Sequence, residues 1–165
     1  MKKIILATIG ILATATPAFA GSGNQSTATG TATATIVAPI VLTHPASASL
    51  NFGRFTTGTG GSVTVTAAGV GSVGSDVTFV PGSTNSADQF TVAGDASRSF
   101  SITTTGGNVT SGATNLAFTT SASASSASLS TTGTASFTVG GTLTVTGTAP
   151  AGAYTGSYTA TVTYN

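Results

Sequence analysis

The sequence contains no cysteine, no tryptophan and no glutamate, and charged residues make up only 4% of its 165 residues. Without cysteine the chain can form no disulfide bond and cannot be lipid-modified at a cysteine, so an exported domain must be held by packing and hydrogen bonds. Without glutamate, the paired carboxylates that glycoside hydrolysis requires could come only from aspartate. These absences exclude a disulfide scaffold and leave little material for acid–base catalysis.

Charge of both signs is scarce, and half of the positive charge lies at the start of the chain. Residues 21–165 contain Arg54, Arg98 and three aspartates, which gives a formal charge of −1, whereas the whole chain carries +1. No basic face exists to neutralise phosphates, so the sequence predicts no nucleic-acid binding. No lysine follows Lys3, which excludes Lys–Asn isopeptide cross-links.

Residues 1–20 have the composition of a secretory signal peptide. Lys2 and Lys3 precede an apolar stretch, and the Ala-Phe-Ala sequence at 18–20 is a small-x-small cleavage site. No later apolar run reaches the roughly 20 residues that a membrane span requires, so no transmembrane anchor is expected. The sequence therefore predicts export of the chain.

Alternation of apolar and polar residues with a period of two recurs through the rest of the chain, and a helical period does not. Runs rich in Val, Phe and Thr are separated by Gly, Pro, Asn and Asp about every 8 to 12 residues, which is typical of a β-sandwich. The predicted β segments are 27–43, 49–55, 62–68, 76–80, 89–93, 99–104, 116–121, 126–130, 135–146 and 154–164. One continuous strand over 27–43 would be unusually long for a sandwich, so we expect a free N-terminal extension followed by the first strand of the domain. We expect an all-β fold.

The same pattern predicts turns and the core. Gly106-Gly107-Asn108 indicates a turn between strands, and Gly140-Gly141 indicates a bulge or a turn inside a long β segment. Inward-facing positions follow from the alternation. They are Leu50, Phe52, Val63, Val65, Val77, Phe79, Phe90, Val92, Phe100, Ile102, Leu116, Phe118, Phe137, Val139, Leu143 and Val145.

Catalytic residue types are nearly absent. The one histidine, His44, is followed by Pro45, which predicts a solvent-exposed position at a strand end. A Ser-His-Asp arrangement would need His44 to be oriented by an aspartate. We expect Asp76, Asp88 and Asp95 instead to bond their own backbone in turns, and they lack the dense spacing of a calcium loop. The sequence predicts no enzyme, no cofactor and no metal centre, and a hydrolase is the least favoured alternative.

Threonine rows support a second hypothesis. Residues 64–66, 142–146 and 159–163 each place hydroxyl and methyl groups in a row on one sheet face. Surfaces that bind ice or glycans look like this, although threonine is also the generic choice for the wet face of a strand. The alternative function is therefore a monomeric secreted β-sandwich that binds a glycan, ice or another surface, with its N-terminal strand closing its own sheet.

Both ends of the chain alternate strictly. In residues 27–36, hydroxyl side chains at odd positions alternate with small or apolar residues at even positions, which are Ala28, Gly30, Ala32, Ala34 and Ile36. The last fourteen residues, GAYTGSYTATVTYN, repeat the pattern. There the residues on one side are Gly152, Tyr154, Tyr158, Ala160, Val162 and Tyr164.

The C-terminal stretch resembles the terminal motif of chaperone-usher fimbrial subunits, with glycine fourteenth from the end, alternating apolar residues and a penultimate tyrosine. In that family the subunit is an immunoglobulin-like Greek-key β-sandwich that lacks one strand, and the N-terminal extension of another subunit completes it by donor-strand exchange. The resemblance implies an extension at 21–34 and a pilin-like domain at 35–165. It assigns donation to Ala28, Gly30, Ala32, Ala34 and Ile36, and the groove strand to Gly152, Tyr154, Tyr158, Ala160, Val162 and Tyr164.

The body of the chain is similar to small secreted proteobacterial proteins classed as a domain of unknown function and related to spore coat protein U. The matching stretches include ATIVAPIVL, LNFGRF, GGSVTV and DQFTVAGDASRSFSIT. Together, the two resemblances imply a secreted structural subunit of a fimbrium or outer coat, located at the cell surface after transit through the periplasm. The implied partners are further copies of the chain, a periplasmic chaperone and an outer-membrane usher.

Overall fold

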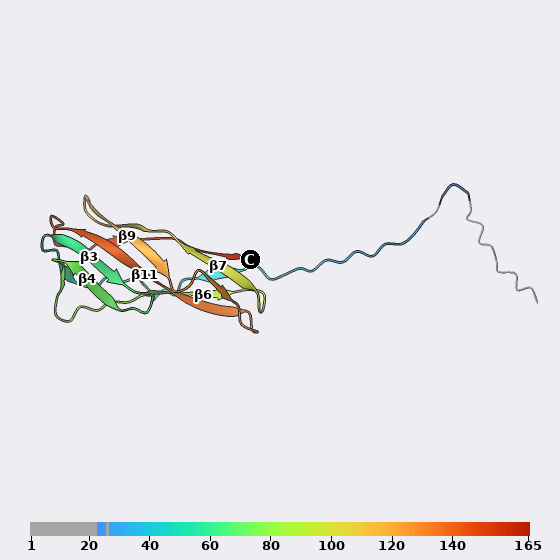
Figure 1. Cartoon of the computed structure of the whole chain (residues 1–165), viewed down its shortest axis with the longest axis horizontal. Coiled ribbons are helices and arrows are strands. Elements are labelled where there is room, and N and C mark those ends of the chain that lie inside the picture. Colours follow the sequence, from blue (N-terminus) through green and yellow to red (C-terminus); the bar gives the residue numbers. More distant parts are fainter. Residues whose placement is uncertain (1–22, 26) are drawn as a thin grey trace, which may run out of the picture. The chain divides into compact units, whose positions relative to one another are not determined.

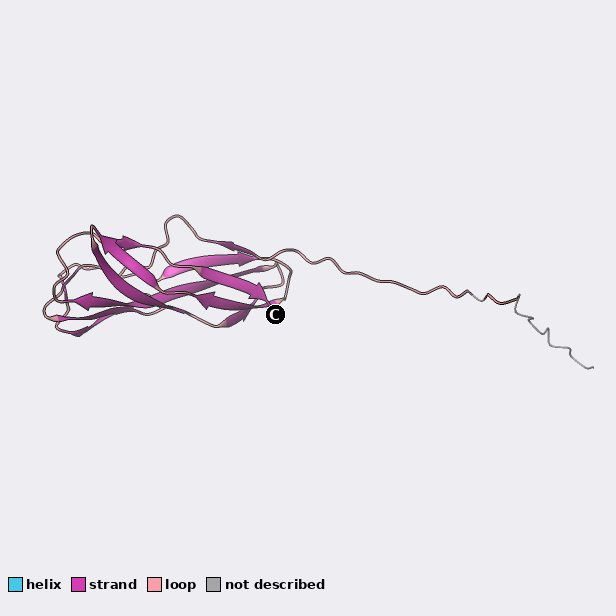
Figure 2. Ribbon diagram, turned by 90° about the horizontal axis from the view of Figure 1, so that it is seen from above, coloured by secondary structure: helices cyan, strands magenta, loops and turns pink. Residues whose placement is uncertain are grey.

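The structure is a computed structural model that describes residues 23–25 and 27–165. Figure 2 shows strands and loops in this part of the chain, and none of the described residues lies in a helix. The predicted all-β fold is confirmed for them. Within the described residues there is no helix that is long and apolar enough to cross a membrane. The predicted signal peptide at 1–20 lies outside the described residues.

Most strands belong to one antiparallel sheet that curls into a half-barrel (Figure 1). Its strands are β1 (Val41–Thr43), β3 (Gly60–Val65), β4 (Gly71–Ser75), β6 (Asp88–Ala93), β8 (Gly107–Ser111), β9 (Thr114–Ala122), β11 (Thr134–Thr146) and β12 (Thr155–Gly156). The order is β1-β6-β11-β9-β8-β12, while β3 pairs with both β11 and β4. The long strand β11 therefore organises the sheet.

Two smaller sheets complete the fold. Their strands are β7 (Ser99–Thr104), β10 (Ser126–Ser128) and β13 (Ala160–Tyr164) in one sheet, and β2 (Phe55–Thr56) and β5 (Thr78–Phe79) in the other. The three-stranded sheet has the order β10-β7-β13, so the C-terminal strand β13 is an edge strand. Residues 36–165 form one compact unit.

The core consists of two apolar clusters. The first cluster is Phe52, Val63, Val65, Val77, Leu116, Phe118, Leu143 and Val145. The second cluster is Phe90, Val92, Phe100, Ile102, Leu129, Phe137 and Val139, and it joins β6 and β11 to β7 of the three-stranded sheet. The predicted core is confirmed at these positions, with Leu50 and Phe79 only partly buried. Leu129 was not predicted, because it follows a stretch of small Ser and Ala residues.

The Gly140-Gly141 pair is neither a bulge nor a turn. Both residues are buried inside the continuous strand β11, where pairing passes from β6 to β3. A Cβ added at Gly140 would meet the carbonyl oxygen of Val65, and one added at Gly141 would meet that of Thr119. Glycine is needed here because backbone from β3 and β9 approaches β11 too closely for a side chain.

The predicted turn at 106–108 is also wrong. Residues 107–111 form β8, which pairs with both β9 and β12. Thr104 pairs with Ala160, and Val109 pairs with Gly156. The segment from Thr104 to Val109 is one residue longer than the segment from Gly156 to Ala160 that it faces, so Gly106 and Gly107 form a bulge. The bulge lets one extended segment pair with β12 and β13 in succession.

Segment 27–43 forms a strand only at its C-terminal end. Residues 27–40 contain no strand, and β1 begins only at Val41. Residues 27–35, described by themselves, have exposed side chains throughout. The regular alternation of this segment therefore has no strand partner among the described residues.

Candidate functional site

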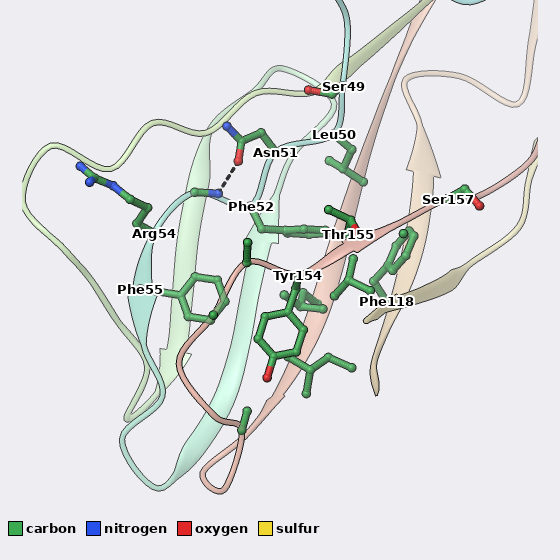
Figure 3. A pocket seen from close by; sticks show the side chains of 18 of the residues that line it. Ser49, Leu50, Asn51, Phe52, Arg54, Phe55, Phe118, Tyr154, Thr155 and Ser157 are labelled. Carbon is green, nitrogen blue, oxygen red and sulfur yellow. Dashed lines mark hydrogen bonds between the residues drawn. The ribbon is translucent and has the colours of Figure 1, made fainter. Parts of the chain in front are cut away.

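An open cavity of about 1190 Å³ lies between residues 49–57 and residues 149–158 (Figure 3), and we call it the groove. Leu50, Phe52, Val109, Leu116, Phe118 and Leu143 line it with apolar side chains. Arg54 also lines the groove, and its guanidinium donates to Gly82 C=O at 3.3 Å; in Figure 3 this side chain points away from the rings of Phe55 and Tyr154. The apolar side chains belong to the first core cluster or pack against it, so the groove lies directly beside that cluster.

Residues 149–158 are held in place along one side only. Ala149 N–H donates to Thr146 C=O at 3.1 Å, which turns the chain after β11. The Tyr154 hydroxyl then donates to Pro150 C=O at 2.9 Å, and β12 pairs with β8. The side of this segment that faces the groove has no strand partner among the described residues.

The free edge continues along β13. Thr105 N–H donates to Thr159 C=O at 3.0 Å and Asn165 N–H donates to Ser99 C=O at 3.1 Å, so odd-numbered residues of the C-terminal strand bond to β7. In an antiparallel pair, the residues between these bonds direct their backbone groups to the opposite side. The N–H and C=O groups of Tyr158, Ala160 and Val162 therefore face an edge that no described strand pairs.

A polar cluster closes one end of the groove. Asp88 is only 3% exposed, yet its carboxylate lies among three partners. The Tyr158 hydroxyl donates to Oδ2 at 2.7 Å, Gln89 N–H donates to Oδ1 at 2.8 Å, and His44 Nε2 lies 2.7 Å from Oδ1. The Tyr158 ring also makes edge contacts with Phe90 and Phe118, each at 6.2 Å between ring centroids. The cluster fixes Tyr158 where the two core clusters meet.

The prediction of a turn position for Asp88 is wrong, although the predicted bond to local backbone does form, from Gln89 N–H. Asp88 begins β6 and points inward with Phe90 and Val92, so an alternation extended by one residue would have placed it inside. His44 has a half-exposed side chain, 44%, as a strand-end histidine should, but its ring is bound to a buried carboxylate. The sequence offered no signal for that pairing, because the two residues are 44 positions apart.

The other two aspartates behave differently. Asp76 accepts a hydrogen bond from the Thr59 hydroxyl, and Asp95 forms an ion pair with Arg98 at 3.2 Å. Both pairs are exposed, so they contribute little to stability. Among the described residues, no three His, Cys, Asp or Glu side chains are grouped so that they could hold a metal ion.

The pKa of Tyr158 predicts an alkaline transition. Burial raises this pKa well above the ordinary value of about 10, and the hydrogen bond to Asp88 and the negative charge of Asp88 raise it further. Because the folded pKa exceeds the unfolded one, the stabilisation is complete below about pH 10 and is lost as the pH rises further. We expect wild type to lose stability more steeply above pH 10 than Tyr158→Phe in urea unfolding. Equal slopes for the two chains would contradict the burial of this hydroxyl.

The predicted groove-strand residues are divided between two environments. Gly152, Tyr154 and Tyr158 line the groove. Ala160, Val162 and Tyr164 pack instead against the second cluster, together with Ile40 and Leu42. The groove therefore accompanies only the first half of the C-terminal segment.

Tyr164 fixes the point where the chain enters the compact unit. Its hydroxyl donates to Ala38 C=O at 3.0 Å and accepts from Asp95 N–H at 2.7 Å. The Arg98 guanidinium carbon lies 5.5 Å from its ring centroid, and a Cβ added at Gly94 would meet the hydroxyl. The penultimate tyrosine thus ties the C-terminal strand to residue 38.

The predicted donor residues are exposed. Ala28, Gly30, Ala32 and Ala34 lie in the segment that contains no strand. Ile36 is 97% exposed, the highest value among the exposed large hydrophobic residues that the structure describes. Each of these side chains is therefore accessible to another molecule.

Hydroxyl side chains line up across four strands. Ser72 of β4 pairs with Thr64 of β3, Thr64 with Thr142 of β11, and Thr142 with Thr119 of β9. The hydroxyls of Thr64 and Thr142 lie 3.0 Å apart. The predicted threonine rows at 64–66 and 142–146 therefore meet at Thr64 and Thr142.

One family model matches the chain. It is described as Domain of unknown function (DUF4402), and it covers residues 42–164. The match includes both sides of the groove, the polar cluster and Tyr164, and it ends short of residues 27–36 at the N-terminal side. No curated protein and no solved structure matches the chain.

Proposed function

The chain belongs to the DUF4402 family, and we propose that it is a structural subunit of a cell-surface filament or coat. In this assembly, each domain is completed by a strand from another copy of the chain. The observation that carries the proposal is the apolar groove beside an unpaired strand edge. Apolar side chains supply the floor, and free backbone groups supply one wall. The two together are what an added β-strand requires.

Insertion of a strand would satisfy both features. A strand lying between residues 49–57 and 149–158 would cover Phe52, Phe55 and Tyr154, and it would pair with the free edge of the C-terminal segment. Left open, such an edge invites uncontrolled pairing between chains. The proposed domain is thus an immunoglobulin-like sandwich in which the missing strand is supplied from outside.

Residues 27–36 of a second copy are the proposed occupant. They carry no charged residue, they alternate between hydroxyl and apolar or small side chains, and they form no strand in their own chain. The aromatic rings of Phe52, Phe118 and Tyr154 already project into the groove, so small inward residues such as Ala32 leave room for the backbone to approach. Main-chain ladder bonds would then supply most of the affinity.

Export and assembly factors follow from the same proposal. Residues 1–20 would direct the chain out of the cytoplasm. An exposed apolar groove would need a cover before assembly, which is the role proposed for a periplasmic chaperone, and an outer-membrane usher would order the addition of subunits. The proposed location is the cell surface, and we propose no enzymatic activity.

Deletion of residues 21–34 tests the proposal. We expect the shortened chain to fold and to form no polymer, because the donor strand is gone while the groove remains. Assembly is measured as ladders that resist SDS and collapse on boiling, and as filaments in electron micrographs. Filaments from the shortened chain would show that the proposal is wrong.

A matched pair of substitutions tests the alternation itself. Ala32→Asp places a charge on the face proposed to enter the groove, whereas Thr33→Asp places the same charge on the opposite face. We expect Ala32→Asp to abolish the ladders and Thr33→Asp to leave them, since burying an unpaired carboxylate is costly. Equal behaviour of the two variants would contradict strand insertion.

A second candidate function is favoured by the hydroxyl row across β4, β3, β11 and β9. Such an uncharged row fits a repetitive hydroxylated surface, such as a glycan or ice. If the protein functions as a monomer that binds such a surface, residues 21–165 should stay monomeric and stable at every concentration. Concentration-dependent ladders would favour the filament.

A further inference from the structure

Three exposed apolar residues flank the point where the chain enters the compact unit. Ile36 is 97% exposed, Val37 is 36% exposed and Val41 is 51% exposed. Ala38 lies between them and is tied to the Tyr164 hydroxyl at 3.0 Å. Exposed large apolar side chains within one short segment favour an interaction surface at this point of the chain.

The anchor at Ala38 limits how far Ile36 can move from the unit. Two residues of extended chain span at most about 7 Å. Whatever binds Ile36 must therefore touch this end of the same unit. Val41 lies in β1, which is fixed by its pairing with β6, so it stays within reach of the same contact.

The groove lies toward the other end of the unit. Figure 1 shows β3 and β4 at one end, and β6, β7 and the C-terminus at the other. Residues 49–57 lead into β3, and residues 149–158 follow the end of β11 that pairs with β3. Val80, which is 37% exposed, also lines the groove. A contact between two different surfaces repeats from copy to copy, and it produces an open filament when the rotation between copies does not close into a ring.

We propose that Ile36 anchors the donated segment in the groove of the next copy, with Val37 and Val41 against the rim of that groove, so that successive domains touch. The proposal rests on the function proposed above. Ile36 is the one large side chain of the inward row, and its neighbours in that row are alanine or glycine. It therefore contributes most of the side-chain burial, and its closeness to Ala38 removes any free linker between domains.

Substitution of Ile36 tests the anchor. For residues 21–165, we expect Ile36→Ala to raise the critical concentration for assembly roughly 10- to 100-fold, because three buried carbons are lost. Ile36→Leu should stay close to wild type. The matched control is Val70→Ala, at a site that is 63% exposed between β3 and β4 and does not line the groove, and it should change nothing. Wild-type assembly of Ile36→Ala would overturn the proposal.

An insertion tests the contact between domains. Four Gly/Ser residues placed between Val37 and Ala38 should still permit assembly, but the filaments should bend more sharply, with a clearly shorter persistence length in electron micrographs. Unchanged stiffness would overturn the domain contact.

If deletion of 21–34 abolishes assembly while Ile36→Ala does not affect it, this inference fails and the proposed function stands. Filaments from the deletion variant would overturn both.

Discussion

A chain that carries its own donor strand at the C-terminus should unfold at a clearly higher denaturant concentration and should no longer polymerise. The variant lacks residues 21–36 and continues after Asn165 with a Gly/Ser linker and a copy of residues 27–36. The linker must return along β13 from Tyr164 to Tyr158, about 20 Å at 3.3 Å per residue. A flexible linker of about ten residues has a root-mean-square span near 17 Å, which suffices.

The expected gain follows from effective concentration. A short flexible linker holds the donor at roughly millimolar concentration near the groove. If this exceeds the dissociation constant of the segment by about 100-fold, the folded state gains about 2.7 kcal/mol. Urea unfolding measures the gain, and gel filtration shows whether the chain is monomeric.

The control for this variant differs at one position. The same appended segment carries aspartate in place of its copy of Ala32, so the linker and length are unchanged while insertion is blocked. We expect this control to have the stability of the chain without a donor. An equal gain from both variants would mean that the added residues stabilise the domain without entering the groove.

Apolar periodicity predicted the core well, because burial on one face of a strand imposes alternation on the sequence. It failed for β4, whose residues Gly71–Ser75 are mostly Gly and Ser, and for β8, which begins with Gly107 and Asn108. These strands are held largely by backbone pairing: only Val109 of β8 packs against the first core cluster, and Val73 of β4 is 39% exposed. Such strands carry turn-like composition and leave no apolar signal.

The candidate site was less predictable, since it depends on contacts between distant segments. The alternation of the last residues continues unbroken to Tyr164, yet the groove accompanies only the part before Ala160. From Ala160 onward, the inward side chains pack against the second cluster together with Ile40 and Leu42, and they do not line the groove. The tie between Tyr164 and Ala38 likewise joins residues 126 positions apart.

Asp88→Ala should be among the most destabilising single substitutions in the chain. It removes the acceptor of the Tyr158 hydroxyl and of Gln89 N–H, and it leaves His44 without its partner. Each of the two donors left unpaired, the Tyr158 hydroxyl and Gln89 N–H, costs about 1–3 kcal/mol. We therefore expect the free energy of unfolding in urea to fall by roughly 2–6 kcal/mol.

Asp76→Ala is the matched control, because Asp76 is exposed and bonds only the Thr59 hydroxyl; its expected cost is below about 1 kcal/mol. Equal losses at the two aspartates would mean that the polar cluster does not stabilise the folded domain.

The polar cluster also orients the groove wall. Tyr158→Phe and Asp88→Ala both remove the hydrogen bond that orients this ring, so both should weaken assembly. The loss should be larger for Asp88→Ala, because Gln89 N–H and His44 lose their partner as well. We therefore attribute the burial of the Asp88 carboxylate beside an apolar groove to its role in positioning Tyr158.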